Sequence, residues 1–173
     1  MTYDQLSPNE RAAMRDAVDR ALWAKDQSGR AGIAAAVLRD GVSIGRGENE
    51  VGLQADPTKH AEMVALTEAS HVMGQSDLSG CIMISTLQPC EMCLAALRFA
   101  GMERVILGAT QDKVAAKYFM FPGLSIDDFQ AAGKPFEAIG GQFEIGLLPL
   151  YIDSQEQASR RRRIEQSSRS RLE

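Results

Sequence analysis

Residues 7–25 carry apolar side chains at every third or fourth position, which is the period of a helix with one buried face. The members of this stripe are Met14, Ala17, Val18, Ala21 and Leu22. Ser7 and Glu10 flank Pro8 in the pattern of a capping box with proline at the first helical position. The sequence therefore predicts a helix that begins at Pro8 and ends at about Lys25.

Short strand-like segments follow, and those at residues 33–39, 81–86 and 105–109 are almost wholly apolar, which is typical of buried strands. Strands are predicted at residues 33–39, 42–47, 81–86, 105–109 and 142–145. Asp40-Gly41 is predicted to join the first two strands as a tight hairpin turn, and residues 48–57 are predicted to form a loop. Helices are predicted at residues 60–73 and 90–101, and another is predicted to begin at Ser125. This alternation predicts an α/β fold, a three-layer α/β/α sandwich with a mixed sheet of about five strands.

His60, Glu62, Cys90 and Cys93 supply one imidazole, one carboxylate and two thiols in two short segments. Zinc prefers nitrogen and sulfur ligands in a tetrahedron, and a catalytic zinc keeps one position for water. The histidine and the two cysteines provide three ligands, so the harder carboxylate is left to move protons. H-x-E followed by P-C-x-x-C is a known signature of the zinc deaminases that act on nucleobases.

The predicted helices suit this chemistry. Thr58 is predicted to cap the helix that carries the histidine, and Pro89 is predicted to occupy the first position of the helix that carries the cysteines. Both thiols then lie at a helix N-terminus, where unpaired N–H groups favour the thiolate. Backbone N–H groups near Ala61 and Cys90 are predicted to contact the substrate and to stabilise the charge that develops there.

Less specific interpretations exist for each motif alone. A C-x-x-C pair is also typical of a redox pair, and a lone histidine is often a core residue. Two such motifs at separate predicted helix starts, in a chain with two histidines and three cysteines, favour the metal site. The alternative from another functional class is a protein that binds zinc at this site but has no catalytic activity. Glu62 argues against it, because such a protein does not need that carboxylate.

The composition indicates one globular domain, since 173 residues with 45% apolar and 24% charged side chains can bury a substantial core. This domain is predicted to span residues 1–156, and a basic extension, residues 157–173, is predicted to be helical or disordered. The extension holds six arginines and two glutamates, so the remaining 13 basic and 21 acidic residues give the domain a net charge of −8. An acidic domain favours a small-molecule substrate over a nucleic acid.

The sequence also indicates where the protein works. No stretch approaches the ~18 uninterrupted apolar residues of a membrane span, and residues 1–4 do not open a secretory signal. Three cysteines, two of them in the candidate metal site, fit a reducing cytoplasm. Cys81 falls in a predicted buried strand and is interpreted as a small apolar residue.

The chain resembles the cytidine deaminase superfamily, and within it the branch of guanine deaminases and tRNA adenosine deaminases. The resemblance rests on the metal motifs and on residues 47–51 and 56–62, and it covers about residues 30–112. It implies the strand order 2-1-3-4-5, a homodimer, and a hydrogen bond from Asn49 to the substrate base. Gln88 departs from this branch, which usually carries glutamate before the proline.

The last third of the chain is the part that the resemblance covers least. In guanine deaminases a C-terminal segment closes the pocket, often with an aspartate and a tyrosine, and Asp112, Asp127 and Tyr151 are the candidates here. Aromatic residues gather in this third, and we expect them in the core or in a subunit interface rather than in the substrate wall. They are Tyr118, Phe119, Phe121, Phe129, Phe136, Phe143 and Tyr151.

The motifs and the resemblance together imply hydrolytic deamination of an amino-substituted ring. Zinc lowers the pKa of a bound water towards ~7. Glu62 then passes the water's proton to a ring nitrogen while the hydroxide attacks the carbon that bears the exocyclic amine. Glu62 next shuttles a second proton to the amine, which leaves as ammonia. Conversion of guanine to xanthine is the first hypothesis, because residues 49–51 resemble guanine deaminases and the domain is acidic. A tRNA adenosine deaminase is the second hypothesis, and a deaminase of cytosine or another heterocycle is the third.

Overall fold

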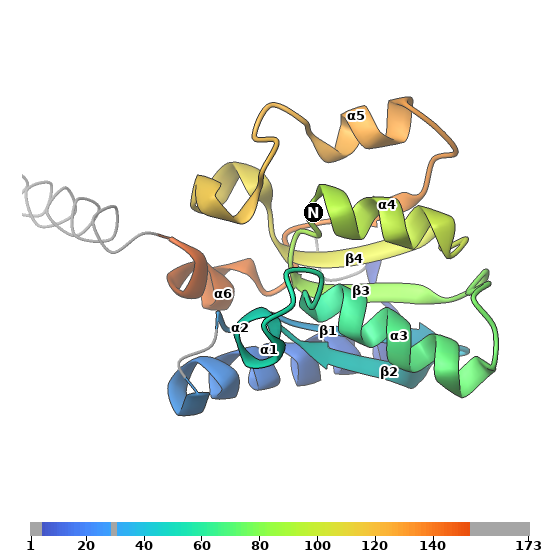
Figure 1. Cartoon of the computed structure of the whole chain (residues 1–173), viewed down its shortest axis with the longest axis horizontal. Coiled ribbons are helices and arrows are strands. Elements are labelled where there is room, and N and C mark those ends of the chain that lie inside the picture. Colours follow the sequence, from blue (N-terminus) through green and yellow to red (C-terminus); the bar gives the residue numbers. More distant parts are fainter. Residues whose placement is uncertain (1–4, 29–30, 153–173) are drawn as a thin grey trace, which may run out of the picture.

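A central five-stranded sheet organises the fold (Figure 1). The computed structural model describes residues 5–28 and 31–152, so the basic extension, residues 157–173, lies outside the described residues. The strands are, in spatial order, β2 (Val42–Glu48), β1 (Ala34–Arg39), β3 (Ile82–Leu87), β4 (Arg104–Ala109) and β5 (Glu137–Ile139). The strand order 2-1-3-4-5 is therefore confirmed.

The sheet is mixed. β1 pairs antiparallel with both β2 and β3, whereas β3, β4 and β5 run parallel to one another. The predicted hairpin is confirmed, because Arg39 pairs with Val42 across a two-residue turn. Both turn residues, Asp40 (φ 50°) and Gly41 (φ 77°), have the positive φ values that a tight hairpin needs.

Helices cover both faces of the sheet, which confirms the three-layer architecture (Figure 1). One face carries α3 (Ala61–Met73) and α4 (Glu91–Phe99), and the other carries α1 (Pro8–Ser28) and α6 (Glu144–Tyr151). The capping box of α1 is formed, since Ser7 N donates to Glu10 Oε2 (2.7 Å) and Glu10 N donates to Ser7 Oγ (3.3 Å). None of the described helices combines the length and the apolar character needed to cross a bilayer.

The end of the described chain differs from the prediction. Residues 142–145 were expected to form the fifth strand, but β5 lies before the glycine pair, at Glu137–Ile139, and the later segment begins α6. The alternation of polar and apolar residues at 142–145 imitates a strand over only four positions. The buried residues Leu147 and Tyr151 are four apart, which is the spacing of a helix face.

Two further elements lie outside the central sheet. The loop expected at residues 48–57 contains a short helix, α2 (Val51–Gln54). The helix start predicted at Ser125 is confirmed as α5 (Ile126–Ala131), whose capping box joins Ser125 and Asp128. Figure 1 shows α5 outside α4, where Arg98 of α4 donates to the carbonyl oxygen of Phe129.

Two glycines in β2 let α3 lie directly on the sheet. A Cβ atom at Gly45 would lie 2.3 Å from Ala65 O, and a Cβ atom at Gly47 would lie 2.2 Å from Ala61 O. Any side chain at these positions would push the helix away. Because Ala61 is the first residue of α3, Gly47 sets the height of the helix start above the sheet.

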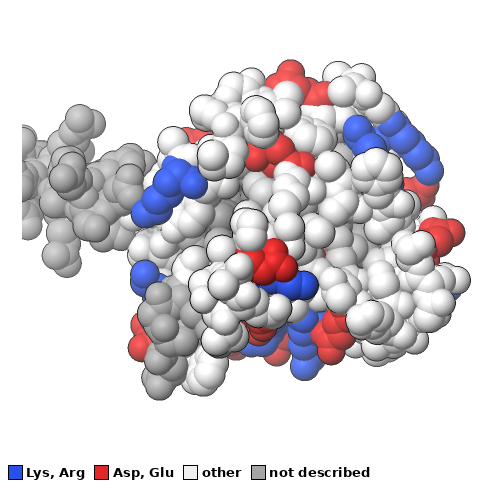
Figure 2. Space-filling view, viewed as in Figure 1, with Lys and Arg blue, Asp and Glu red and all other residues white. Residues whose placement is uncertain are grey.

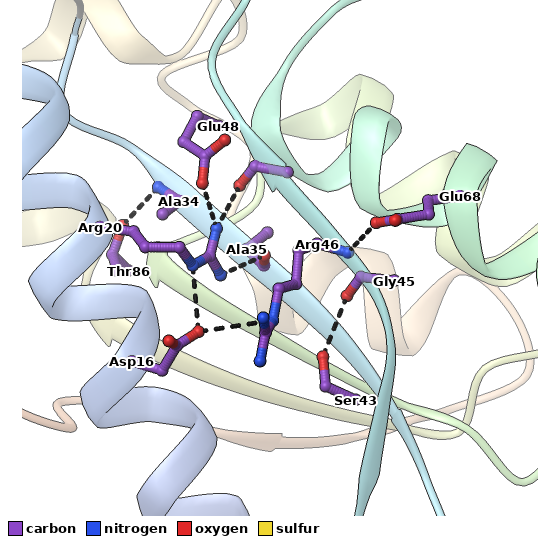
Figure 3. Close-up of polar contacts among 11 residues, drawn as sticks. Asp16, Arg20, Ala34, Ala35, Ser43, Gly45, Arg46, Glu48, Glu68 and Thr86 are labelled. Atoms are coloured by element: carbon purple, nitrogen blue, oxygen red, sulfur yellow. Dashed lines mark hydrogen bonds and ion pairs between the residues drawn. The ribbon is translucent and has the colours of Figure 1, made fainter.

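An arginine of α1 fixes the end of β2 from the opposite side (Figure 3). Arg20 donates to Asp16 Oδ2 (3.0 Å), Gly47 O (3.2 Å) and Ala35 O (2.9 Å), and it forms an ion pair with Glu48. The guanidinium group therefore joins α1, β1 and β2 at one point. Glu48 is the last residue of β2, so this cluster anchors the chain just before Asn49.

Candidate active site

The start of α3 delivers the histidine and the carboxylate. His60 is the N-cap of the helix, with extended backbone (φ −65°, ψ 154°), and Glu62 lies in the first turn. The expectation that Thr58 caps this helix is wrong. The hydroxyl group of Thr58 instead donates to Asp56 Oδ1 (2.7 Å), within the turn that precedes the helix.

The start of α4 delivers the two thiols. Cys90 is the N-cap, Cys93 lies in the first turn, and Leu94 N donates to Cys90 O (2.8 Å). Pro89 therefore precedes the cap and does not occupy the first helical position, as had been predicted. Figure 1 shows that α3 and α4 begin at the same edge of the sheet, where β3 ends.

The three proposed ligand atoms meet at this edge. Cys90 Sγ lies 3.4 Å and Cys93 Sγ lies 3.7 Å from His60 Nδ1, and the two sulfur atoms are 3.7 Å apart. Standard zinc bond lengths in a tetrahedron require about 3.6 Å between nitrogen and sulfur and about 3.8 Å between two sulfurs. The separations and the donor set thus fit zinc with one position left for a fourth ligand.

The thiols and the imidazole are electrostatically coupled. A hydrogen bond with Cys93, helped by His60, lowers the pKa of the Cys90 thiol to about 4 although burial opposes the shift. The hydrogen bond with Cys90, together with burial, raises the pKa of the Cys93 thiol. Contact with Cys90 also raises the pKa of His60. One thiolate is therefore formed at neutral pH, and a metal ion would displace the proton that the second sulfur holds.

Glu62 lies beside this group without joining it. Its carboxylate is 3% exposed, and Ser85 Oγ donates to its Oε1 over 2.8 Å. Cys93 Sγ lies 3.5 Å from its Oε2. Burial raises the pKa of the Glu62 carboxyl group, while the hydrogen bond from Ser85 opposes that rise. A buried carboxyl group with a raised pKa is suited to accept and release protons.

A cavity of about 420 Å³ opens onto His60, Glu62 and Cys90. Asn49 also lines it. Most of the remaining wall is apolar, from Ala31, Ile33, Val51, Pro57, Leu87, Met92, Tyr118, Met120 and Phe121. A mostly apolar wall with a few polar groups is typical of a small-molecule site.

Most of the wall was not found from the sequence. Tyr118 and Phe121 were expected in the core or in an interface, yet both line the cavity, and no sequence pattern points to Glu91 or Lys117 as wall residues. Only the concentration of aromatic residues in this third hinted at a wall. The carboxylate of Glu91 holds the segment in place, because Phe121 N donates to its Oε1 (3.1 Å).

The three candidates from the last third of the chain lie elsewhere. Asp112 and Asp127 are exposed and line a separate cavity, which meets the first one only through Gln88. Tyr151 is completely buried, and its hydroxyl group lies 2.8 Å from both Gly32 O and Thr86 Oγ1. Burial raises the pKa of this hydroxyl group, so it stays protonated as a structural contact.

Comparison with known proteins agrees with this geometry. Guanine deaminase of Bacillus subtilis is 36% identical over 85 residues, which are 49% of this chain and 54% of that protein. The tRNA-specific adenosine deaminase of Aquifex aeolicus is 37% identical over 87 residues, which are 50% of this chain and 58% of that protein. The chain therefore spans little more than half the length of these relatives.

A solved structure from a study of A-to-I editing by tRNA A34 deaminases superimposes with a TM-score of 0.69. The two chains are 27% identical, and the match covers 80% of this chain and 98% of the other. Residues 7–109 also match the family model of the cytidine and deoxycytidylate deaminase zinc-binding region. This match takes in more than half of the chain and includes all three residues whose atoms fit zinc, so the chain belongs to the zinc-binding cytidine and deoxycytidylate deaminase family.

Proposed function

We propose that the protein is a hydrolytic deaminase, which releases ammonia from an amino-substituted nucleobase-type ring. The buried carboxylate of Glu62 is the observation that carries this proposal. It lines the same cavity as His60 and Cys90, but it is not needed as a ligand. A site that only bound zinc would not need a buried carboxylate beside the metal ligands.

Zinc held by His60, Cys90 and Cys93 would supply a water molecule with a lowered pKa and would polarise the reacting bond. Glu62 accepts a proton from the attacking water and donates it to a ring nitrogen. Glu62 then accepts the second proton of the added water and gives it to the amine, which leaves as ammonia.

The substrate that we propose first is guanine, with xanthine as the product. Asn49 Oδ1 accepts a hydrogen bond from Val51 N (3.3 Å), and this contact fixes the orientation of the amide group. Among the described residues, the amide nitrogen of Asn49 has no hydrogen-bond partner, so it offers its N–H groups to a ligand. A purine base with a carbonyl oxygen and unprotonated ring nitrogens has the acceptors that this amide requires.

A tRNA adenosine deaminase is the second candidate, supported by the Aquifex relative and by the arginines at 160–163. The surface around the cavity favours the small molecule. Lys117 is the only lysine or arginine among the described residues that line it, and Glu91 is acidic. On the face shown in Figure 2, basic side chains are scattered among acidic ones and form no continuous patch. Phosphate binding would require such a patch.

Ammonia release across a panel of substrates tests the proposal. The panel holds guanine, adenine, cytosine, their nucleosides and tRNA, each with zinc-loaded protein and with protein stripped by a chelator. We expect release from guanine by the zinc-loaded protein alone. Inosine formation in tRNA, with none from guanine, would favour the second candidate. Release from no substrate at all would contradict deaminase activity.

The assembly in solution is also part of the proposal. We propose a homodimer, which the family resemblance implies. Met120 and Phe121 at the cavity rim are 81% and 63% exposed, and apolar side chains in such positions are suited to burial by a second copy. Light scattering at micromolar concentration should give twice the mass of one chain, and a monomer would contradict this assembly.

A further inference from the structure

On its face of β3, in the middle of the sheet, Ser85 is a hydroxyl group between two apolar side chains. Alternate residues of a strand face the same side, so Ser85 shares its face of β3 with Met83 and Leu87, and all three are buried. Burial removes the hydration of a hydroxyl group, and this cost is offset only by a hydrogen bond. The contact that Ser85 makes therefore indicates why a polar residue occupies this position.

Glu62 is the partner of this hydroxyl group. Ser85 Oγ donates to Glu62 Oε1 over 2.8 Å, and the two side chains are 0% and 3% exposed. The backbone of Ser85 is held on both sides, because it pairs with Ala35 of β1 and with Leu107 of β4. The sheet thus fixes the hydroxyl group, and the hydroxyl group fixes one oxygen of the carboxylate.

We propose that Ser85 is a positioning residue, which holds Glu62 through Oε1 so that Oε2 carries the proton during deamination. This inference rests on the proposed function. When Glu62 is ionised, the hydroxyl group donates to a carboxylate oxygen. When Glu62 carries a proton on Oε2, Oε1 is a carbonyl-type oxygen and still accepts the same hydrogen bond. The contact persists through both proton transfers, so the carboxyl group does not have to turn between them.

Ser85→Ala tests this role, since it removes the hydroxyl group and adds no bulk. On the ring that the wild-type protein deaminates, kcat should fall about 10- to 100-fold, because a hydrogen bond to a charged group is lost. Zinc content should be unchanged. KM and the Kd for xanthine, the deaminated product of guanine, should also be unchanged, because Ser85 does not line the cavity.

Two further variants separate positioning from a general effect on the fold. Ser85→Thr keeps the hydroxyl group and should recover most of kcat, provided that its unfolding temperature shows a normal fold. Thr86→Val removes the neighbouring buried hydroxyl group, which contacts Tyr151 and not Glu62. This control should lower the unfolding temperature without a selective fall in kcat.

Crystals of the zinc-loaded wild type and of Ser85→Ala give a readout that does not depend on turnover. We expect the Glu62 carboxylate to change position in the variant. An unchanged kcat, or a carboxylate that stays in place, would overturn the inference. If the wild-type protein deaminates none of the substrates, the proposed function fails, and the position of Glu62 in the two crystals still decides the role of Ser85.

Discussion

The two sides of the cavity are built in different ways. The metal side consists of residues at the starts of α3 and α4, which are held by helix backbone and by the sheet beneath them. The opposite wall, residues 116–121, has only one short helical turn, Ala116–Tyr118, and its Met120 and Phe121 are largely exposed. Two backbone contacts anchor this wall, from Ala115 N to Tyr151 O (2.9 Å) and from Phe121 N to Glu91 Oε1 (3.1 Å).

This difference suggests that the metal side carries out the chemistry and that the opposite wall recognises the substrate. Chemistry needs groups that are fixed to within fractions of an ångström, and regular elements supply that precision. Recognition of a particular ring depends on the shape of the wall, and a loop can change without disturbing the metal side. We therefore expect substitutions on the metal side to abolish turnover, and substitutions in the wall to change affinity and substrate choice.

Loss of a ligand should have the largest effect. Cys93→Ser replaces a thiolate with a poor zinc ligand at a buried position. We expect the zinc content to fall from near one per chain to near zero, with complete loss of turnover. Elemental analysis after dialysis, beside an ammonia assay, measures both. Full activity without metal would remove zinc from the mechanism.

Glu62→Gln should have the next largest effect. Glutamine keeps the shape of the side chain and the hydrogen bond from Ser85, but it cannot carry the proton. A positioned acid–base group contributes ~100- to 10,000-fold, so kcat should fall by that factor while zinc is retained. Parallel measurements of metal content and kcat decide this, and a near-normal kcat would show that another group moves the proton.

Gly47→Ala tests whether the metal side depends on the height of α3 above the sheet. The new Cβ atom would meet Ala61 O, so the start of the helix must shift. We expect the free energy of unfolding to decrease by about 1–3 kcal/mol and kcat to fall with it. Gly146→Ala in α6 is the matched control, because nothing lies within 4 Å of its Cβ position. The control should change neither quantity much, and equal effects would contradict the close-approach argument.

The sequence revealed the metal side because its geometry is local. Cys90 and Cys93 are one helical turn apart, so their spacing alone brings the two thiols together, and His60 and Glu62 are two residues apart at the start of one helix. The hairpin at Asp40-Gly41 could be predicted for the same reason. Spacing could not show that Ser85 of a distant strand contacts Glu62, because a serine within an apolar run carries no periodic signal.

The last third was harder to predict because long-range packing determines it. β5 is only three residues long, and its pairing with β4 identifies it better than its own sequence does. Tyr118 and Phe121 are of residue types that are common in protein cores. Only the path of residues 116–121 across the start of α4 makes them part of the cavity wall. The same composition is compatible with a core, an interface or a substrate site.

Phe121→Ala tests the wall itself. If the base stacks on Phe121, that contact contributes about 1–3 kcal/mol to binding. Its loss should raise KM by about 5- to 150-fold, while zinc content and kcat change little. Phe99→Ala is the control, because Phe99 is 94% exposed on α4 and is not among the described residues that line the cavity. A fall in kcat without a change in KM would show that Phe121 contributes to the chemical step and not to the binding of the ring.

The smallest effect should follow removal of residues 157–173. The truncation leaves α6 intact, since that helix ends at Tyr151, and it removes six arginines that the deamination of a free base does not require. We expect kcat/KM for guanine to stay near the wild-type value at low and at moderate salt. A tRNA substrate would behave differently, because each phosphate contact that is lost weakens binding and reduces its salt dependence. Turnover of tRNA that disappears with the truncation and with rising salt would therefore show that recognition extends beyond the cavity wall, and it would favour the tRNA adenosine deaminase over the guanine deaminase.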